Sequence, residues 1–199
     1  MTSLRNYINP PAPLIILAGL DGSGKSTVLD HISKMDFPPP IQSAKLGYRR
    51  PGVVTPLPPR NEDGGEQEVT HYSKPNHSAL KSAGKLFVMT LDWFIGYWTK
   101  LAPDLANGHP VVFDRHYLID LAIDPERYRY GGPLWLIYLA QRMIPQPRLV
   151  LFLDVSEEVS QARKQEPGAE NFSEQRQAYL DIAKRSKNWR VIDASQTLP

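Results

Sequence analysis

The sequence of 199 residues contains no cysteine. This absence excludes disulfide bonds, thiolate ligands for a metal and a cysteine nucleophile. It is compatible with a reducing compartment, and we expect the protein in the cytoplasm. The chain also lacks an excess of one charge, because its formal net charge is only +2 and its lysines and arginines are scattered. The composition therefore gives no reason to expect a nucleic-acid partner.

No long apolar run is free of charged residues. Residues 79–101 are largely apolar, but Lys81, Lys85, Asp92 and Lys100 interrupt them, and a membrane-spanning helix tolerates such charges poorly. Near the N-terminus the apolar run is only five residues long and follows three prolines, unlike a signal peptide. We expect a soluble protein with no membrane span.

The most informative stretch that is present is the glycine-rich segment over residues 19–27, GLDGSGKST. It fits G-x-x-x-x-G-K-[ST] and stands between an apolar run and a segment with helical character. Its glycines let successive N–H groups point at an anion, and the helix N-terminus adds positive charge. Lys25 would bridge the β- and γ-phosphates, and Ser26 would place its hydroxyl on Mg²⁺. The loop residues predicted to bind a nucleoside triphosphate are Gly19, Asp21, Gly22, Ser23, Gly24, Lys25, Ser26 and Thr27.

The rest of the chain alternates short apolar runs with helical patterns. Strands are expected at residues 14–18, 41–46, 110–113, 149–153 and 189–192. This order is typical of an α/β fold with a doubly wound, five-stranded parallel sheet. We expect one domain over residues 14–199, after an irregular lead-in over residues 1–13. A long Pro/Gly-rich loop is expected over residues 51–76 and a short lid over about residues 156–176.

The longest predicted helix covers residues 79–101. Apolar residues recur along it at helical spacing, and we expect them to face the core. They are Leu80, Phe87, Leu91, Phe94, Trp98 and Leu101.

Several landmarks in sequence order resemble the thymidylate kinase-like branch of the P-loop nucleotide kinases. They cover most of residues 14–197 and include the acid in the glycine-rich loop, a strand that ends in Asp-Arg-His, a Leu-Asp-Val strand end followed by a helix with an arginine, and a C-terminal strand. The residues concerned are Asp21, Asp114, Arg115, His116, Leu153, Asp154, Val155, Arg163, and residues 191–195. The resemblance implies a P-loop NTPase fold and ATP-dependent phosphoryl transfer.

The resemblance also implies roles for these residues. Lys25, Mg²⁺ and an arginine from the lid would neutralise the charge of the transferred group. We expect that arginine to be Arg163, with Lys164 or Arg176 as alternatives; without the resemblance, a solvated helix face would explain Arg163 better than a catalytic role. Asp114 would hold a Mg²⁺-bound water, which makes Ser26 and Asp114 the predicted metal residues.

Arg115 would face the transferred phosphoryl group or the phosphate of the acceptor. A structural salt bridge is the alternative for the Asp114-Arg115 pair. The resemblance further implies that Asp21 contacts an acceptor hydroxyl and that Ser195 lies near the adenine. The predicted catalytic residues are thus Lys25, Asp114, Arg115 and Arg163.

The departures from the family pattern cluster on the acceptor side. The loop after the second strand is Arg50-Pro51-Gly52 and lacks the family's acid, and Asp92 is followed by Trp93 instead of arginine. We therefore expect that the enzyme is not a selective thymidylate kinase, because a missing partner changes which acceptor is recognised.

A loop with Arg127, Arg129 and Tyr130 stands where the family has other residues. Arginines between tyrosines suit an anion together with aromatic stacking, such as a sugar phosphate or a non-thymine nucleotide. A plain surface loop is the alternative. The predicted acceptor-binding residues are Asp21, Arg50, Asp92, Arg115, Arg127, Arg129 and Tyr130.

Two functions follow from these patterns. The first is a kinase that acts on a small, phosphorylated acceptor. The second is a switch or adaptor that binds ATP without small-molecule kinase activity, and the Pro-rich segment favours it. The sequence is also compatible with a homodimer.

Overall fold

The structure is a computed structural model that describes residues 3–37, 43–54, 74–164 and 171–196. Its backbone falls into two compact units, and the single domain expected over residues 14–199 stays a prediction. The sheet unit comprises Met1–Tyr48, Asp104–Arg115 and Pro147–Pro199, and the helical unit comprises Arg49–Pro103 and His116–Gln146. Most of the expected loop over residues 51–76 and part of the expected lid lie outside the described residues.

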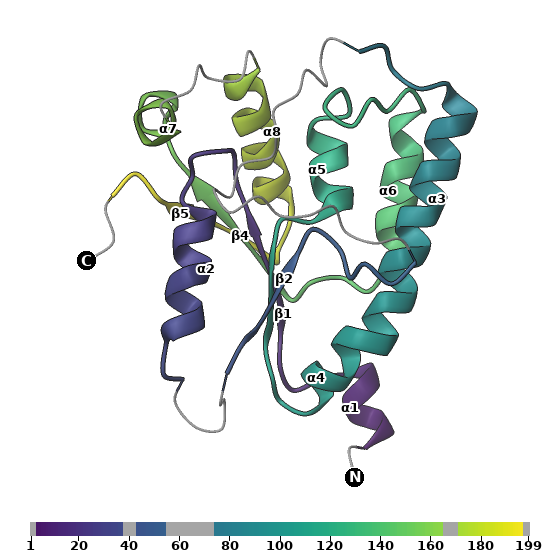
Figure 1. Cartoon of the computed structure of the whole chain (residues 1–199), viewed down its shortest axis with the longest axis vertical. Coiled ribbons are helices and arrows are strands. Elements are labelled where there is room, and N and C mark those ends of the chain that lie inside the picture. Colours follow the sequence, from purple (N-terminus) through teal and green to yellow (C-terminus); the bar gives the residue numbers. More distant parts are fainter. Residues whose placement is uncertain (1–2, 38–42, 55–73, 165–170, 197–199) are drawn as a thin grey trace. The chain divides into compact units, whose positions relative to one another are not determined.

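The sheet unit contains one sheet of five parallel strands, in the order β2-β3-β1-β4-β5 (Figure 1). They are β1 Leu14–Ala18, β2 Lys45–Tyr48, β3 Val111–Asp114, β4 Leu149–Asp154 and β5 Trp189–Asp193. The predicted α/β fold with a five-stranded parallel sheet is confirmed. The second strand begins at Lys45, later than the expected residue 41, because its ladder with β3 runs from Lys45 opposite Val111 to Tyr48 opposite Asp114.

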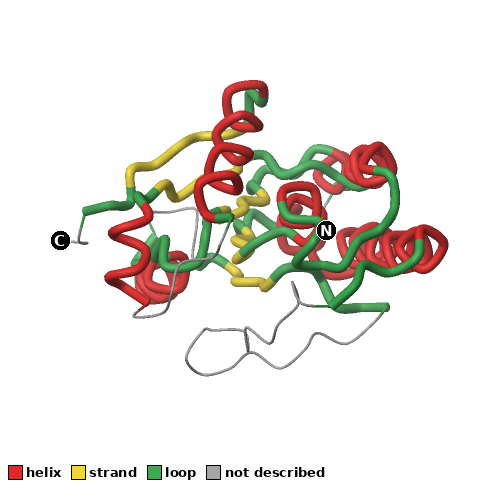
Figure 2. Tube along the Cα trace, turned by 90° about the horizontal axis from the view of Figure 1, so that it is seen from above, coloured by secondary structure: helices red, strands yellow, loops and turns green. Residues whose placement is uncertain are grey.

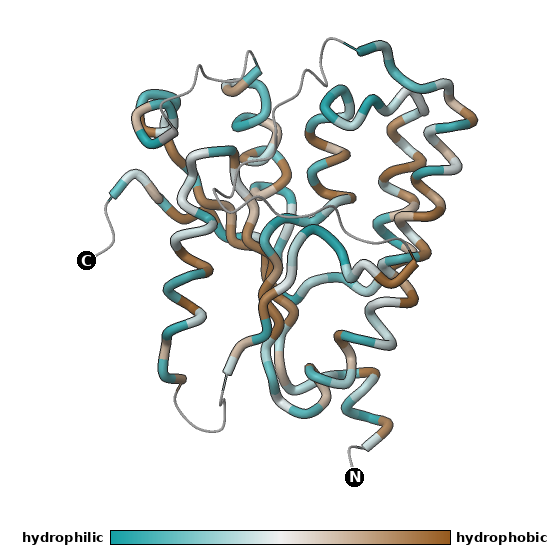
Figure 3. The backbone as a smooth tube through the Cα atoms, in the orientation of Figure 1, coloured by the Kyte–Doolittle hydropathy of each residue, from teal (hydrophilic) through white to brown (hydrophobic). Residues whose placement is uncertain are grey.

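Helices cover both faces of this sheet, as a doubly wound fold requires. Helix α2, Lys25–Lys34, places Leu29 in a cluster with Leu17 and Val112 on one face. On the other face, Tyr179 of helix α8, Phe172–Arg185, stacks on Phe152 with ring centroids 4.7 Å apart. Figure 1 shows α2 and α8 on opposite sides of the strands, and Figure 3 shows these strands as mostly hydrophobic.

Two further helices belong to the sheet unit. Helix α7, Glu157–Lys164, follows β4. Helix α1, Leu4–Ile8, lies in the segment that we expected to be irregular, so that expectation is wrong for these residues. The hydroxyl of Ser3 accepts a hydrogen bond from the N–H of Arg5, a cap that supports even a helix of five residues.

The helical unit contains α3 Ala79–Gly96, a π-helical turn η1 Tyr97–Leu101, α5 Tyr117–Ile123 and α6 Leu134–Met143. The hydroxyl of Ser78 caps α3 by accepting from the N–H of Lys81. Helix α6 contacts both α3 and α5 (Figure 1 and Figure 2). Helix α4, Ala102–Ala106, continues from η1 across the division between the units.

The face that α3 buries differs from the predicted one. Leu101 is buried as expected, but Leu80, Phe87, Phe94 and Trp98 are 40–85% exposed. The buried residues of α3 are Ser82, Leu86, Met89, Thr90, Asp92, Trp93 and Gly96. Helical periodicity shows that a helix has apolar positions but does not show which side meets the rest of the protein. Here Asp92 contacts Arg50 and Trp93 stacks on His116, and these contacts lie on the side of the helix that is buried.

Within the part of the chain that the structure describes, no helix combines the length and apolar character that a bilayer crossing requires.

Candidate active site

The glycine-rich loop joins β1 to α2, as predicted. Gly22 and Gly24 adopt φ angles of 78° and 88°, in the left-handed region where residues with a Cβ are disfavoured. A Cβ on Gly22 would also lie 2.7 Å from the hydroxyl oxygen of Ser160. The loop therefore needs glycine both for its turn and for the close approach of α7.

Lys25 is the first residue of α2, and its side chain points back into the loop. Only 6% of the residue is exposed. Its Nζ donates to the carbonyl oxygens of Gly19 at 2.8 Å and Leu20 at 2.6 Å, and to the Ser23 hydroxyl at 3.2 Å. Gly24 stands at the N-cap position and has no side chain with which to cap the helix. A buried ammonium and a helix N-terminus in a tight loop fit the phosphates of a nucleotide.

Asp114 and Arg115 lie at the carboxyl end of β3, next to this loop in the sheet. Asp114 is opposite Leu17 in the ladder of β1 and β3, and it is buried. Arg115 has a φ of 70°, and its N–H donates to the Leu17 carbonyl at 3.0 Å. Its guanidinium forms an ion pair with Asp21 of the loop. The structure thus brings three predicted residues together, and Asp21 is an ion-pair partner of Arg115.

Helix α7 also contacts the glycine-rich loop. The Ser160 hydroxyl donates to the Asp21 carbonyl at 2.7 Å, which fastens α7 to the loop. Sequence reasoning missed Ser160, although its position three residues before Arg163 places both on one side of the helix. Arg163 donates to the carbonyl oxygens of Ser195 at 3.2 Å and Gln196 at 3.3 Å.

Arg163 also reaches the loop itself, because its Nη1 lies 3.8 Å from where a Cβ of Gly24 would be. The predicted residues Arg163, Gly24 and Ser195 are therefore neighbours. The side chain of Lys164, an alternative to Arg163, lies outside the described part of the structure.

Arg176, the other alternative to Arg163, has a different position. It makes two parallel hydrogen bonds to Asp154 at the end of β4, Nε to Oδ1 at 2.6 Å and Nη2 to Oδ2 at 2.8 Å. A bidentate arginine of this kind is held in place. Ser195 is oriented in turn by Asp193, whose pKa is lowered by hydrogen bonds from the hydroxyl and the N–H of Ser195.

In the helical unit, Asp92 is fully buried in α3. Its carboxylate accepts hydrogen bonds from Arg50 and from the N–H groups of Gly52, Val53 and Val54. Burial raises the pKa of Asp92, but the hydrogen bonds, led by that from Val54 and followed by those from Arg50 and Gly52, lower it by more, so the net pKa is below the usual value.

The neighbouring Trp93, which stands where the family has arginine, stacks on His116 with ring centroids 4.1 Å apart. His116 is buried, and burial lowers its pKa to about 3. The pair is therefore an uncharged aromatic contact at neutral pH.

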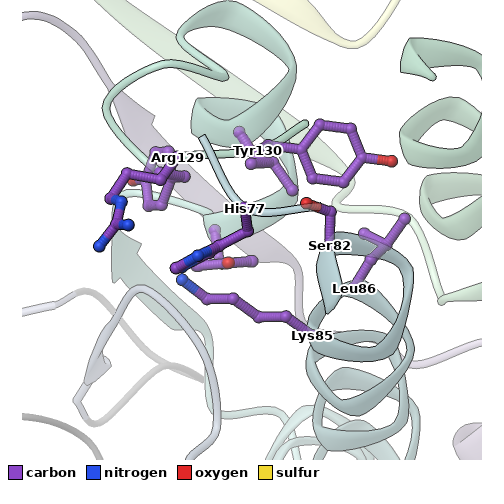
Figure 4. Close-up of a pocket in the computed structure, with 9 residues that line it drawn as sticks. His77, Ser82, Lys85, Leu86, Arg129 and Tyr130 are labelled. Carbon is purple, nitrogen blue, oxygen red and sulfur yellow. The ribbon is translucent and has the colours of Figure 1, made fainter. Parts of the chain in front are cut away.

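The arginine-tyrosine loop packs on the segment before α3. The N–H of Arg127 donates to the carboxylate of Asp124 at 3.0 Å, and Nε of Arg129 donates to the Pro75 carbonyl at 2.9 Å. Tyr130 is buried and donates to the carbonyl of Pro133. Arg129 and Tyr130 line a pocket together with residues that sequence reasoning missed, among them His77 and Lys85 (Figure 4).

The oxygen ligands that this site offers suit a Mg²⁺ ion that is bound partly by phosphates. Among the described residues, no three side chains of the His, Cys, Asp and Glu types form a metal cluster. Mg²⁺ usually binds one or two protein ligands and completes its shell with phosphate oxygens and water. Ser26 at the start of α2 and Asp114 at the end of β3 fit that smaller requirement.

Comparison with known proteins agrees with these features. The family model described as thymidylate kinase matches residues 17–198. The chain is 30% identical to the thymidylate kinase of Shewanella loihica, over 94% of this chain and 90% of that protein. It is 25% identical to the probable thymidylate kinase of Archaeoglobus fulgidus, over 93% and 88%, and 27% identical to the thymidylate kinase of Blochmanniella pennsylvanica, over 92% and 88%. The chain therefore belongs to the thymidylate kinase family of phosphotransferases, as its motifs predicted.

Proposed function

We propose that the protein transfers the γ-phosphoryl group of ATP to a small acceptor that already carries a phosphate. The acceptor is a nucleoside monophosphate or another phosphorylated metabolite. The observation that carries this proposal is the convergence of Lys25, Arg163 and the Asp21–Arg115 pair on the glycine-rich loop. Family membership favours a kinase over a nucleotide-binding switch.

Phosphoryl transfer depends mainly on positioning and on neutralising charge. Bound ATP and Mg²⁺ supply the reacting phosphoryl group and part of that neutralisation. Lys25 holds positive charge inside the loop, and the first N–H groups of α2 add to it. Ser26 and Asp114 would hold the metal. Arg163, beside Gly24 and Ser195, stabilises the charge that develops during transfer.

The acceptor is expected to differ from thymidylate. Trp93 replaces the arginine that the family places after the helix aspartate, and it is engaged with His116. The Asp92 carboxylate receives four donors from Arg50 and the following loop. These contacts make Asp92 a residue that positions the loop. The other proposed acceptor contacts remain Asp21, Arg50, Arg115, Arg127, Arg129 and Tyr130.

The experiment that tests this function is a panel of acceptors assayed for ADP formation, with ATP and Mg²⁺ fixed. The panel holds thymidylate, other nucleoside monophosphates and sugar phosphates, and kcat/KM is measured for each. We expect an acceptor other than thymidylate to be preferred. A preference for thymidylate above about a hundredfold, near 2.7 kcal/mol, would overturn the acceptor assignment. Nucleotide binding without transfer to any acceptor would support the switch.

We also propose that the protein acts in the cytoplasm, as a homodimer formed through the helical unit. Helix α3 leaves Phe87 and Phe94 exposed, the turn η1 after it leaves Trp98 exposed, and α6 leaves Trp135 and Leu139 exposed. Apolar side chains of this size on two contacting helices favour a protein interface over solvent. Sedimentation velocity should show a dimer that Phe94→Asp weakens, and a monomer at every concentration would exclude it.

A further inference from the structure

The hydroxyl group of Ser160 makes a contact outside its own helix. Ser160 lies in α7, and only 6% of it is exposed. The hydroxyl groups of Thr90 and Thr99 donate to carbonyl oxygens four residues earlier in the chain, at 2.7 and 2.8 Å, as is common for helical hydroxyl groups. That of Ser160 instead donates to the carbonyl oxygen of Asp21 in the glycine-rich loop, at 2.7 Å. It therefore connects α7 to one particular peptide group of the loop.

That peptide group, between Asp21 and Gly22, is the centre of a type II turn. The N–H of Ser23 donates to the carbonyl oxygen of Leu20 at 3.2 Å, which closes a turn of four residues. Gly22, the third residue of the turn, has a φ of 78°, and Asp21 is not among the described residues with a positive φ. A positive φ at the third residue alone identifies type II, because type I is negative there and type I′ is positive at both central residues.

The peptide group at the centre of such a turn has two possible orientations. Type I and type II turns differ in ψ of the second residue and φ of the third, which amounts to a rotation of the peptide group between them. Glycine at the third position accepts both signs of φ, so Gly22 by itself leaves both orientations open. The hydrogen bond from Ser160 holds the carbonyl oxygen of Asp21 on the side of α7. Ser160 therefore selects the type II orientation.

The N–H group of Gly22 takes its direction from the same peptide group. A trans peptide is planar, and its N–H points opposite to its carbonyl oxygen, so this N–H points away from the hydroxyl of Ser160. Among the described residues, no acceptor forms a hydrogen bond with it. In glycine-rich loops, N–H groups of this kind are the donors that bind phosphate oxygens. Gly22 therefore offers a donor whose direction depends on Ser160.

We propose that Ser160 is a positioning residue for nucleotide binding. It holds the peptide group between Asp21 and Gly22 in the orientation in which the N–H of Gly22 donates to a phosphate of ATP. The inference rests on the proposed function in one respect, because it takes ATP to be the molecule that the loop binds. A donor that is already oriented before the nucleotide arrives lowers the cost of binding. Helix α7 thus orients the loop through Ser160 and supplies Arg163 beside Gly24.

The first test is made on the full chain without nucleotide. The residual dipolar coupling of the Gly22 N–H bond, measured by NMR, reports the direction of that bond. The wild type should show the single direction that the structure gives, and Ser160→Ala should show a coupling averaged over two orientations. Ser156→Ala is the matched control, because the Ser156 hydroxyl accepts from the N–H of Val159 at the start of the same helix. It should leave the coupling unchanged. An unchanged coupling in Ser160→Ala would overturn the proposal.

The second test measures, by calorimetry, the affinity for a non-hydrolysable ATP analogue with Mg²⁺. Ser160→Ala should weaken this affinity about threefold to tenfold, because without that hydrogen bond only a fraction of the molecules has the binding orientation. Ser156→Ala should change the affinity less than about twofold, although it removes a helix cap and lowers stability in urea unfolding. Equal weakening by the two variants would show that α7 acts only as a structural element, and it would overturn the positioning role.

Asp21→Ala separates the carbonyl oxygen of Asp21 from its carboxylate, which pairs with Arg115. The carbonyl oxygen remains in this variant, so Ser160→Ala should weaken binding of the analogue by the same factor in the Asp21→Ala background as in the wild type. A factor that disappears in that background would show that Ser160 acts through the carboxylate, and it would overturn the proposal. Binding that depends on Ser160, without phosphoryl transfer to any acceptor, would instead contradict the proposed function and leave this role of Ser160 in place.

Discussion

Arg50 and Asp92 form a buried ion pair within the helical unit, with Nη1 of Arg50 3.1 Å from Oδ2 of Asp92. Their side chains are only 8% and 0% exposed. Three backbone N–H groups, from Gly52, Val53 and Val54, complete the shell around the carboxylate. One side chain of α3 therefore determines the path of the segment that follows β2.

Asp92→Asn should destabilise the protein by about 3–5 kcal/mol at pH 7, because it removes the negative charge that faces the buried guanidinium of Arg50. Urea unfolding measures the loss, and Asp181→Asn is the control, since Asp181 pairs with Lys184 at an exposed site where about 0–1 kcal/mol is expected.

The same pair predicts a pH dependence. The pKa of Asp92 in the folded protein lies below its unfolded value of 3.8. The stability that ionised Asp92 adds to the folded protein is therefore complete above pH 3.8, and it is lost as the pH falls through the folded pKa. The difference between wild type and Asp92→Asn should therefore shrink below about pH 4. A difference that stays constant down to pH 3 would contradict this account.

Lys25→Ala should abolish phosphoryl transfer and leave the fold largely intact. The ammonium lies among loop oxygens, where its charge serves phosphate binding. A steady-state assay and circular dichroism decide the matter, with Lys34→Ala as a control at an exposed pair with Asp30. Activity of Lys25→Ala within about tenfold of the wild type, or roughly 1.4 kcal/mol in the barrier, would refute the role of Lys25.

Arg163→Ala should lower kcat strongly, because its guanidinium lies beside Gly24 and Ser195 where the transferred charge develops. Removal of an electrostatic stabiliser of this type costs about a hundredfold in kcat. Arg176→Ala should act mainly on stability, because Arg176 is paired with Asp154. If kcat falls with Arg176→Ala and not with Arg163→Ala, the two assignments must be exchanged.

Gly96→Ala should destabilise the protein although alanine is the better helix former. A Cβ there would lie 2.2 Å from Cβ of Pro51, and such overpacking costs about 1–3 kcal/mol. Gly84→Ala is the matched control in the same helix, because its Cβ would meet nothing within 4 Å. Thermal unfolding should show a loss for Gly96→Ala and a gain of up to about 1 kcal/mol for Gly84→Ala.

The sequence by itself determined the features that neighbouring residues encode. The loop at residues 19–27 needs only its own glycines and the helix that Lys25 begins. The buried strand β1 follows from five consecutive apolar residues. The order of such apolar runs predicted the parallel sheet and placed Asp114 and Arg115 at its carboxyl edge.

Tertiary structure alone decided which partners these residues have. The ion pair of Asp21 with Arg115 and the contact of Ser160 with the loop join residues 94 and 139 positions apart. The orientation of α3 was predicted wrongly, because both of its sides carry apolar residues and only the contacts of Asp92 and Trp93 select one. The contact of His77 with Arg129 likewise joins two distant segments. Sequence periodicity describes one element at a time, whereas burial depends on what distant segments bring to it.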